Sequence, residues 1–285
     1  MGLANCSMVL EGGAIKGVFT SGALDFLMEQ DFYTKYVVGV SAGACNAVDY
    51  VSKQIHRSRD CFIPSRKEDK YIRIGNIVHR KPVYDMDIAF HEFPLKRIPF
   101  DFDTFYASDM ECEVVVTNCV TGKAEYMKAS QDRAAFLNIL RASSSMPFLC
   151  DLVYINGVPY LDGGMSDSIP VERAIERGYK KNIVILTKNK GYRKKESKFI
   201  TSLSNKKYDE YPELKRLIGN RWKYYNQEMM LVEKLEKEGT IFVLRPEIKA
   251  ISRLEQNRKK TMDFYMHGYA LMKERYGELM NYLNS

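Results

Sequence analysis

No stretch of this 285-residue chain approaches the ~18–20 consecutive apolar residues that a membrane-spanning helix requires. The first residues, Met1 to Cys6, contain no basic stretch followed by an apolar stretch, so they lack the pattern of a secretory signal. Cys6 also stands where a myristoylation signal prefers Ser or Thr. We therefore expect a cytoplasmic protein, and we leave peripheral contact with a membrane open.

Metal-binding and disulfide patterns are also missing. No Cys-x-x-Cys pair occurs, which excludes the spacing typical of zinc sites and gives no sign of a disulfide framework. We expect most of the cysteines to be small buried side chains in a reducing compartment. No calcium-loop pattern occurs either, so the sequence predicts no metal and no cofactor. The six cysteines are Cys6, Cys45, Cys61, Cys112, Cys119 and Cys150.

Signatures of nucleic-acid binding are lacking as well. Lys and Arg number 43 against 36 Asp and Glu, a net charge of +7, but the basic residues do not gather on one recognisable reading helix. Such a mild basic bias suits an anionic membrane surface and equally suits ordinary solubility. We therefore predict no nucleic-acid partner, and the sequence carries no signal for an oligomeric state.

Two phosphate-binding patterns can be compared with the Gly-rich stretch 12–17. It contains no Gly-Lys-Ser/Thr at the spacing of a P-loop. A degenerate dinucleotide-binding turn is the other alternative, but the second predicted strand ends in Ser41 rather than in the acidic residue that would hold a ribose.

The composition, 45% hydrophobic and 28% charged, is that of an ordinary folded protein. Buried strands are predicted at 7–10 and 36–38, and each is followed by apolar residues at helical spacing. This βαβα alternation is typical of a mostly parallel sheet with helices on both faces. The predicted fold is a three-layer α/β/α sandwich with a mostly parallel central sheet, plus a C-terminal helical segment.

The rest of the chain divides into ordered and irregular stretches. Residues 56–108 have no clean period, and we expect an irregular, lid-like insertion over the sheet. We predict a loop over 188–207, which is basic and poor in apolar residues. Further elements are predicted at 112–118, 124–127, 132–141, 154–161, 170–178, 183–186, 211–237, 241–244 and 254–282.

These elements suggest a division into a catalytic domain over 6–187 and a mainly helical region of undefined role over 191–285. In the second region Tyr225, Met229 and Val232 recur with Leu235 at helical spacing, a stripe more typical of core packing than of a ligand site.

The strongest signal for function is Gly39-Val40-Ser41-Ala42-Gly43, which lies between a predicted strand and a predicted helix. A serine flanked by glycines at such a turn matches a nucleophile elbow, which holds the hydroxyl clear of the sheet edge. The helix that follows directs its positive end at charge that develops there. Ser41 is therefore the candidate nucleophile.

Two other motifs open onto the same edge of the predicted sheet. The turn at Gly12 and Gly13 follows the first strand and can direct backbone N–H groups at one point. Asp162, in Asp162-Gly163-Gly164, follows a strand-like run. Because the carboxyl ends of neighbouring parallel strands lie side by side, we expect all three motifs on one rim.

In this order, the motifs resemble those of the patatin-like phospholipase family, in particular its bacterial members. The resemblance covers about residues 6–187 and includes Ala142-Ser143-Ser144-Ser145-Met146-Pro147 before the Asp motif and Ser166-Asp167-Ser168-Ile169-Pro170 after it. It implies a serine lipid acyl hydrolase of the phospholipase A or lysophospholipase type. By resemblance, Ser41 attacks the ester carbonyl, Asp162 is the base of a Ser–Asp dyad, and Gly12 and Gly13 form the oxyanion hole.

One residue departs from the family pattern. Ala14 stands where the family loop usually has a third glycine, and an alanine there would be strained if the position needs a positive φ. Lys16 is placed to favour an anionic head group, and a solvated lysine is the equal alternative. Supporting motif positions are Ala14, Lys16, Gly17, Gly39, Gly43, Gly163 and Gly164.

Two other functions stay open at this stage. One is an α/β-hydrolase triad, Ser41–Asp162–His267, whose chain order fits, although His267 lies in a helix-like stretch. The other histidines, His56, His79 and His91, carry no motif. The second alternative is a non-catalytic lipid-binding protein on the same fold. The expected partner is a lipid or another acyl-ester substrate, and its acyl chain and head group are not set by the sequence.

Overall fold

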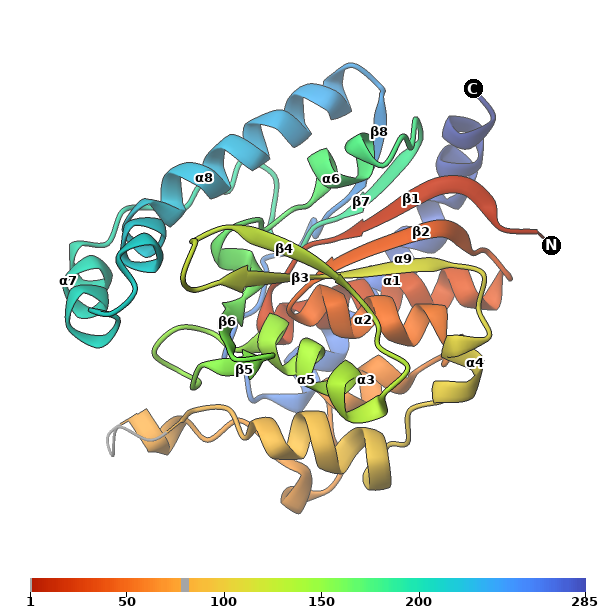
Figure 1. The fold of residues 1–285 in the computed structure, drawn as a ribbon. Coiled ribbons are helices and arrows are strands. Elements are labelled where there is room, and N and C mark those ends of the chain that lie inside the picture. Colours follow the sequence, from red (N-terminus) through yellow and green to blue (C-terminus); the bar gives the residue numbers. More distant parts are fainter. Residues whose placement is uncertain (1, 78–81) are drawn as a thin grey trace.

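A central sheet of eight strands organises the structure, a computed structural model that describes residues 2–77 and 82–285 (Figure 1). Its strands follow the order β5-β6-β3-β2-β1-β7-β8, and β4 pairs with β3. β1, β2, β3, β7 and β8 run parallel, whereas β4, β5 and β6 join by antiparallel pairing. The strands are β1 (Ala4–Leu10), β2 (Thr34–Val40), β3 (Glu111–Asn118), β4 (Ala124–Lys128), β5 (Val153–Ile155), β6 (Val158–Asp162), β7 (Asn182–Ile185) and β8 (Ile241–Leu244).

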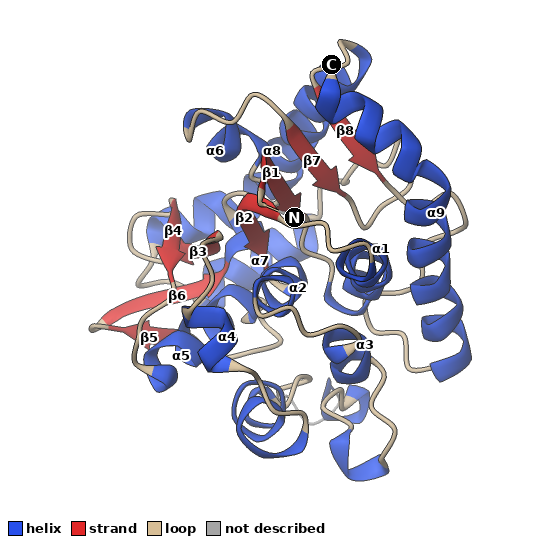
Figure 2. Ribbon diagram, turned by 90° about the vertical axis from the view of Figure 1, so that its right-hand side faces the viewer, coloured by secondary structure: helices blue, strands red, loops and turns tan. Residues whose placement is uncertain are grey.

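Helices cover both faces of this sheet, and Figure 2 shows α1, α2 and α9 along one face from a second direction. α6 and α8 pack on the opposite face. The predicted three-layer α/β/α sandwich with a C-terminal helix is therefore confirmed. The α-helices are α1 (Val18–Glu29), α2 (Ala42–Val51), α3 (Arg57–Phe62), α4 (Phe102–Tyr106), α5 (Arg133–Ser144), α6 (Val171–Glu176), α7 (Lys198–Lys207), α8 (Pro212–Lys237) and α9 (Arg258–Asn284).

Successive side chains of the parallel strands point to opposite faces of the sheet, and an apolar core lies on each face. Met8 and Leu10 of β1 pack toward α1, α2 and α9, whereas Val9 packs with α6 and α8 on the other face. A strand buried on both faces reads as a continuous apolar run, which is the pattern of Met8-Val9-Leu10 in the sequence.

Two stretches contain more regular structure than the sequence predicts. The insertion at 56–108 includes α3, α4 and the π-helix η4 (Ile88–Arg97), together with the 3-10 turns η2 (Lys67–Asp69) and η3 (Ile74–Ile77). These pieces are short and Pro94 lies inside η4, so no long apolar period marks them. The predicted loop at 188–207 contains α7, whose one buried residue is Ser204. Two further 3-10 turns, η1 (Ala14–Gly17) and η5 (Gly163–Met165), follow β1 and β6.

The C-terminal region shares the sheet and the core with the first part of the chain. β8 pairs with β7 at the sheet edge, and α9 packs against α1. At this crossing, a Cβ on Gly268 would overlap the carbonyl oxygen of Phe19, and one on Gly22 would overlap that of Tyr265. The two helices therefore approach backbone to backbone. The division at about 187–191 stays a prediction.

Over the described residues, no helix combines the length and the apolarity needed to cross a membrane.

Candidate active site

Strand register brings the Ser and Asp motifs to one rim of the sheet. Val40, just before Ser41, pairs with Val115 of β3, and the next β3 residue, Val116, pairs with Asp162 of β6. Ser41 and Asp162 therefore flank the same point of β3, one strand away on either side. β6 is antiparallel, so the sequence argument from parallel strand ends was wrong for Asp162. The residue reaches the rim because β6 pairs only with the last residues of β3.

Ser41 occupies a strained elbow between β2 and α2. Its backbone has φ 56° and ψ −122°, a combination that a non-glycine residue rarely adopts. The turn is tight because α2 starts against β1: a Cβ on Gly43 would overlap the carbonyl oxygen of Leu10. This is the geometry of a nucleophile elbow, in which a serine hydroxyl is held at the sheet edge.

The C-terminal end of α5 supports both Ser41 and Asp162. The hydroxyl of Ser143 accepts the Ser41 N–H at 2.9 Å and donates to the carbonyl of Val115 at 2.7 Å. Two residues on, the Ser145 carbonyl accepts the N–H of Asp162 at 2.8 Å. The serine-rich stretch 142–147, which the sequence analysis attributes to the family pattern, thus anchors the backbones of both residues.

Asp162 is a buried carboxyl whose pKa is raised. Burial is the main cause, and it outweighs four influences that lower the pKa: the charge of Arg221, the Ser41 hydroxyl, the Gly164 N–H and the charge of Lys194. The Gly164 N–H donates to Oδ1 at 2.8 Å and fixes the carboxyl orientation. A carboxylate with a raised pKa is a stronger base than an ordinary aspartate, and Asp162 lines the same cavity as Ser41.

The glycine turn after β1 lies directly against Ser41. A Cβ on Gly12 would stand 3.2 Å from Ser41 Cβ, and one on Gly13 would stand 2.6 Å from Thr187 Oγ1. Thr187 Oγ1 lies 3.1 Å from the Gly12 carbonyl oxygen and donates to it. Because a trans peptide points its C=O and N–H in opposite directions, the Gly13 N–H points away from Thr187. Within the described ranges, the N–H groups of Gly12 and Gly13 donate to no protein acceptor.

Ala14 adopts φ 51°, the left-handed conformation that favours glycine. The strain that the sequence analysis considered at this position is therefore present. A left-handed alanine costs roughly 1–2 kcal/mol. The side chain nevertheless lines the site, next to Ser41.

Seven predicted positions line a polar cavity at the rim and four pack beneath it. The lining residues are Ser41, Asp162, Gly12, Gly13, Ala14, Lys16 and Gly164. The packing residues, Gly17, Gly39, Gly43 and Gly163, allow close approach of neighbouring chain segments.

Sequence reasoning missed a buried polar cluster around Glu11. Glu11 Oε1 accepts from the Tyr225 hydroxyl at 2.8 Å and from Lys188 Nζ at 3.1 Å. Burial opposes ionisation of Glu11, but Lys188, the Thr187 N–H and the Tyr225 hydroxyl outweigh it and lower its pKa. A charged residue directly after a buried apolar strand was the available signal. Tyr225 belongs to the predicted core stripe, and it also lines the polar cavity.

Arg221 of α8 was missed as well. Its Nε donates to the Gly164 carbonyl at 2.8 Å, and its charge acts on Asp162. The helix α8 therefore contributes a cation to the site, although it follows the Asp motif by many residues in the sequence.

Two cavities of opposite character meet at Ser41. The polar cavity has a volume of about 670 Å³, and the apolar one has a volume of about 110 Å³. Ala14, Ser41 and Met146 line both cavities. The insertion contributes much of the apolar wall, including Tyr84, Phe90 and Phe93.

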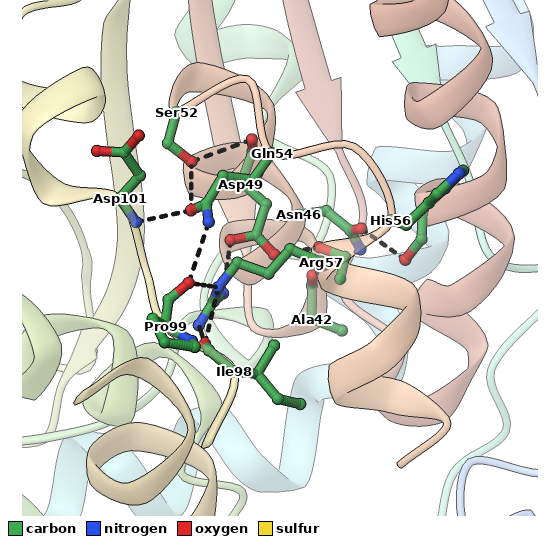
Figure 3. A network of polar contacts seen from close by, with 12 residues as sticks. Ala42, Asn46, Asp49, Ser52, Gln54, His56, Arg57, Ile98, Pro99 and Asp101 are labelled. Carbon is green, nitrogen blue, oxygen red and sulfur yellow. Dashed lines mark hydrogen bonds and ion pairs between the residues drawn. The ribbon is translucent and has the colours of Figure 1, made fainter. Parts of the chain in front are cut away.

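A buried ion pair closes one side of the apolar cavity (Figure 3). Arg57 Nη1 lies 2.7 Å from Asp49 Oδ1, and the Ser58 hydroxyl donates to Asp49 Oδ2 at 2.6 Å. Arg57 also donates to the carbonyls of Ile98 and Pro99. This network ties α2 to α3 and to the end of the insertion, and it leaves the Arg57 charge compensated.

The three histidines in the described part of the chain lie away from Ser41. His267 Nε2 accepts the N–H of Glu247 at 3.0 Å, and its ring packs at a tilt of 45° against Phe19, with 5.6 Å between the ring centroids. His56 pairs with Asp25 at 3.2 Å, and exposed His91 contacts Glu92. None of these three lines either cavity. His79 lies outside the described residues.

Two family models and one curated protein match this chain in sequence. A family model described as patatin-like phospholipase matches residues 8–175, and one described as a domain of unknown function (DUF6363) matches residues 211–284. The chain is 34% identical over 205 residues to the uncharacterized protein YjjU of Escherichia coli (strain K12). That match covers 64% of this chain and 51% of YjjU, so the chain spans about half the length of this curated relative.

A solved structure shares the fold. VipD from Legionella pneumophila matches with a TM-score of 0.51 and 13% sequence identity, over 98% of this chain and 66% of VipD. At that identity the likeness concerns the fold alone.

Proposed function

The chain belongs to the patatin-like phospholipase family, and from that premise we propose that it hydrolyses carboxylic esters of lipids through a Ser41–Asp162 dyad. Membership supports lipid acyl hydrolysis in general. The observation that carries the dyad is the strained Ser41 at the junction of two cavities, held across the end of β3 from the buried carboxyl of Asp162.

The proposed reaction has two halves. Asp162 accepts the hydroxyl proton as Ser41 Oγ bonds to the acyl carbonyl carbon, and the alcohol leaves with that proton. Asp162 then takes a proton from water, whose oxygen bonds to the acyl carbon; the bond to Ser41 Oγ breaks, Asp162 returns the proton to Ser41 Oγ, and the fatty acid leaves. We assign the first carbons of the acyl chain to the apolar cavity and the alcohol portion to the polar one.

Gly12 and Gly13 are the proposed oxyanion donors. Their N–H groups have no acceptor in the described part of the protein, and the Thr187 hydrogen bond fixes the peptide between them. A donor of this kind typically contributes about 3–4 kcal/mol to transition-state stabilisation.

The triad with His267 has less support. Nε2 of His267 already accepts a backbone N–H, and the ring is not part of either cavity wall. His267→Ala should therefore keep most ester hydrolysis, whereas Asp162→Asn should lower kcat about 10³-fold. Steady-state kinetics on a short-chain ester distinguishes the two. Loss in His267→Ala with retention in Asp162→Asn would falsify the dyad.

Active-site labelling separates the enzyme from a non-catalytic lipid-binding protein. A fluorophosphonate should label Ser41 in the folded protein, with Ser41→Ala as the unlabelled control. No labelling of the wild-type chain would favour the binding protein. Hydrolysis of phospholipids, lysophospholipids, monoacylglycerols and short-chain esters would then define the substrate.

A further inference from the structure

The polar cavity is strongly cationic. Six cationic side chains and two carboxylates line it; the carboxylates are Glu11 and Asp162. The cations are Lys16, Lys188, Lys194, Lys195, Arg221 and Arg253. An excess of one sign inside a concave site raises the local concentration of ligands of the opposite sign.

Two of the six cations are already engaged. Lys188 pairs with Glu11 at 3.1 Å, and Arg221 is held by the Gly164 carbonyl beside Asp162. Among the described residues, no carboxylate forms an ion pair with Lys16, Lys194, Lys195 or Arg253. The positive charge left in the cavity is therefore not neutralised by ion pairing.

These cations also repel one another. Burial and the charges of Lys188 and Arg253 together lower the pKa of Lys16 to about 8, against the opposing effect of Glu11. Burial together with Arg221 and Lys188 lowers the pKa of Lys194 well below its usual value. Burial also raises the pKa of Glu228, near Lys194 and Arg221, so burial favours the neutral form of both Glu228 and Lys194, and a bound anion would favour the charged form of Lys194. An anion that enters the cavity would relieve the repulsion.

The two cavities differ in whether their cationic side chains are ion-paired. In the apolar cavity, Arg57 is neutralised by Asp49 and held by backbone carbonyls, so it offers nothing to an anion. In the polar cavity, Lys194 lies 4.2 Å above the Tyr225 ring and Arg253 is exposed. The anionic end of a ligand would therefore enter the polar side of Ser41.

Most of these cations come from beyond the patatin-like match. That match ends at residue 175, whereas Lys188, Lys194, Lys195, Arg221 and Arg253 follow it. Only Lys16 belongs to the matched segment. The catalytic motifs and the charged wall thus lie on different parts of the chain.

We propose that residues 188–253, with Lys16, form a binding site for the phosphate of an anionic lipid head group, which selects anionic over zwitterionic or neutral acyl esters. The proposal rests on the proposed function, because it assigns the alcohol side of the same substrate. A lipid head group and free phosphate both carry the phosphate that such a site binds. The ligand we assign is the lipid head group.

Binding to a Ser41→Ala protein tests the site without catalysis. Calorimetric titration with octyl phosphate should show binding that is much tighter than for octyltrimethylammonium or inorganic phosphate, because only octyl phosphate has both the anion and the chain. Lys194→Gln and Arg253→Gln, each in that background, should weaken octyl phosphate binding about tenfold, the scale of one charge-assisted hydrogen bond.

Exposed cations outside both cavities provide matched controls. Lys259→Gln and Arg66→Gln make the same chemical changes at exposed positions and should leave the affinity unchanged. The proposal is overturned if Lys194→Gln and Arg253→Gln bind octyl phosphate as tightly as their background. Equal affinity for inorganic phosphate would overturn the assignment to a lipid head group.

An activity measurement adds the substrate preference. The ratio of kcat/KM for 1-octanoylglycerol 3-phosphate to that for 1-octanoylglycerol should fall about tenfold in Arg253→Gln, mainly through KM. An unchanged ratio contradicts the site. If the wild-type protein hydrolyses neither ester and resists fluorophosphonate, the proposed function fails, while the calorimetric result still decides the anion site.

Discussion

At the scale of single residues, Asp162 is held between two opposing influences. Burial favours its neutral form, and Arg221, Ser41, Gly164 and Lys194 favour its carboxylate. A base must be deprotonated to act, so activity should disappear as the pH falls through the pKa of Asp162. Because this pKa lies above the ordinary 3.8, the acidic limb should lie above that of an ordinary aspartate.

Substitution of Arg221 should move this limb in a defined direction. Arg221→Gln removes a cation that lowers the pKa of Asp162, so the acidic limb of kcat/KM on a neutral ester should shift to higher pH. Arg221→Lys keeps the charge and should recover much of the original limb position. The pH profile of all three proteins checks this, and a limb that stays fixed or moves to lower pH in Arg221→Gln contradicts a positioning role for Arg221.

What could be predicted at this scale depends on distance along the chain. Ser41, Gly12 and Gly13 lie in short local patterns that indicate turns at strand ends. Glu11 and Tyr225 could not be paired from the sequence, because 214 residues separate them and Tyr225 fits an ordinary core stripe. The sequence predicts strain at Ala14 only if that position needs a positive φ, and the φ of Ala14 depends on the fold around it.

At the scale of elements, the crossing of α1 and α9 depends on two glycines. Gly268→Ala would place a methyl group on the carbonyl of Phe19, a backbone atom that can yield only if the helices separate. We expect the free energy of unfolding to fall by about 2–3 kcal/mol, the upper range for overpacking.

A second glycine of α9 serves as the control. Gly277 has nothing within 4 Å of a Cβ placed on it, so Gly277→Ala should raise the free energy of unfolding by about 1 kcal/mol through helix propensity. Urea unfolding measures both variants. Equal effects of the two substitutions would show that the crossing is not tightly packed.

The sequence predicts both helices from their apolar periods, but it does not indicate their contact. Glycine inside a helix is usually a weakness, and only the neighbouring backbone shows why Gly22 and Gly268 are needed. The short elements of the insertion escaped prediction for a related reason: α3 and α4 are too short to show a helical period.

At the scale of the whole molecule, the last strand and the last helix complete the sheet and one of its cores. Phe19 and Leu27 of α1, both fully buried, belong to the same apolar cluster as Phe264 and Met272 of α9. Without α9 that face of α1 would lie in water, and without β8 the edge of β7 would be unpaired.

A chain that ends at Thr187 should therefore not fold independently, although it contains every catalytic motif. We expect it to lose the single cooperative thermal transition of the full chain and to bind a hydrophobic dye. Circular dichroism melting and dye fluorescence measure this. A sharp cooperative transition would instead support an independent domain over 6–187.

The two cavities that meet at Ser41 have walls from different stretches of the chain. The apolar wall is drawn mainly from α2, α3, α5 and the insertion, and the charged wall mainly from residues after 187. Arg221, Lys194 and Lys188 act on Asp162 or Glu11, whereas Lys195 and Arg253 are exposed and can be substituted without disturbing the apolar wall or the serine. In evolutionary terms, descendants of such a chain could exchange the polar half of their ligand while keeping the acyl half and the chemistry.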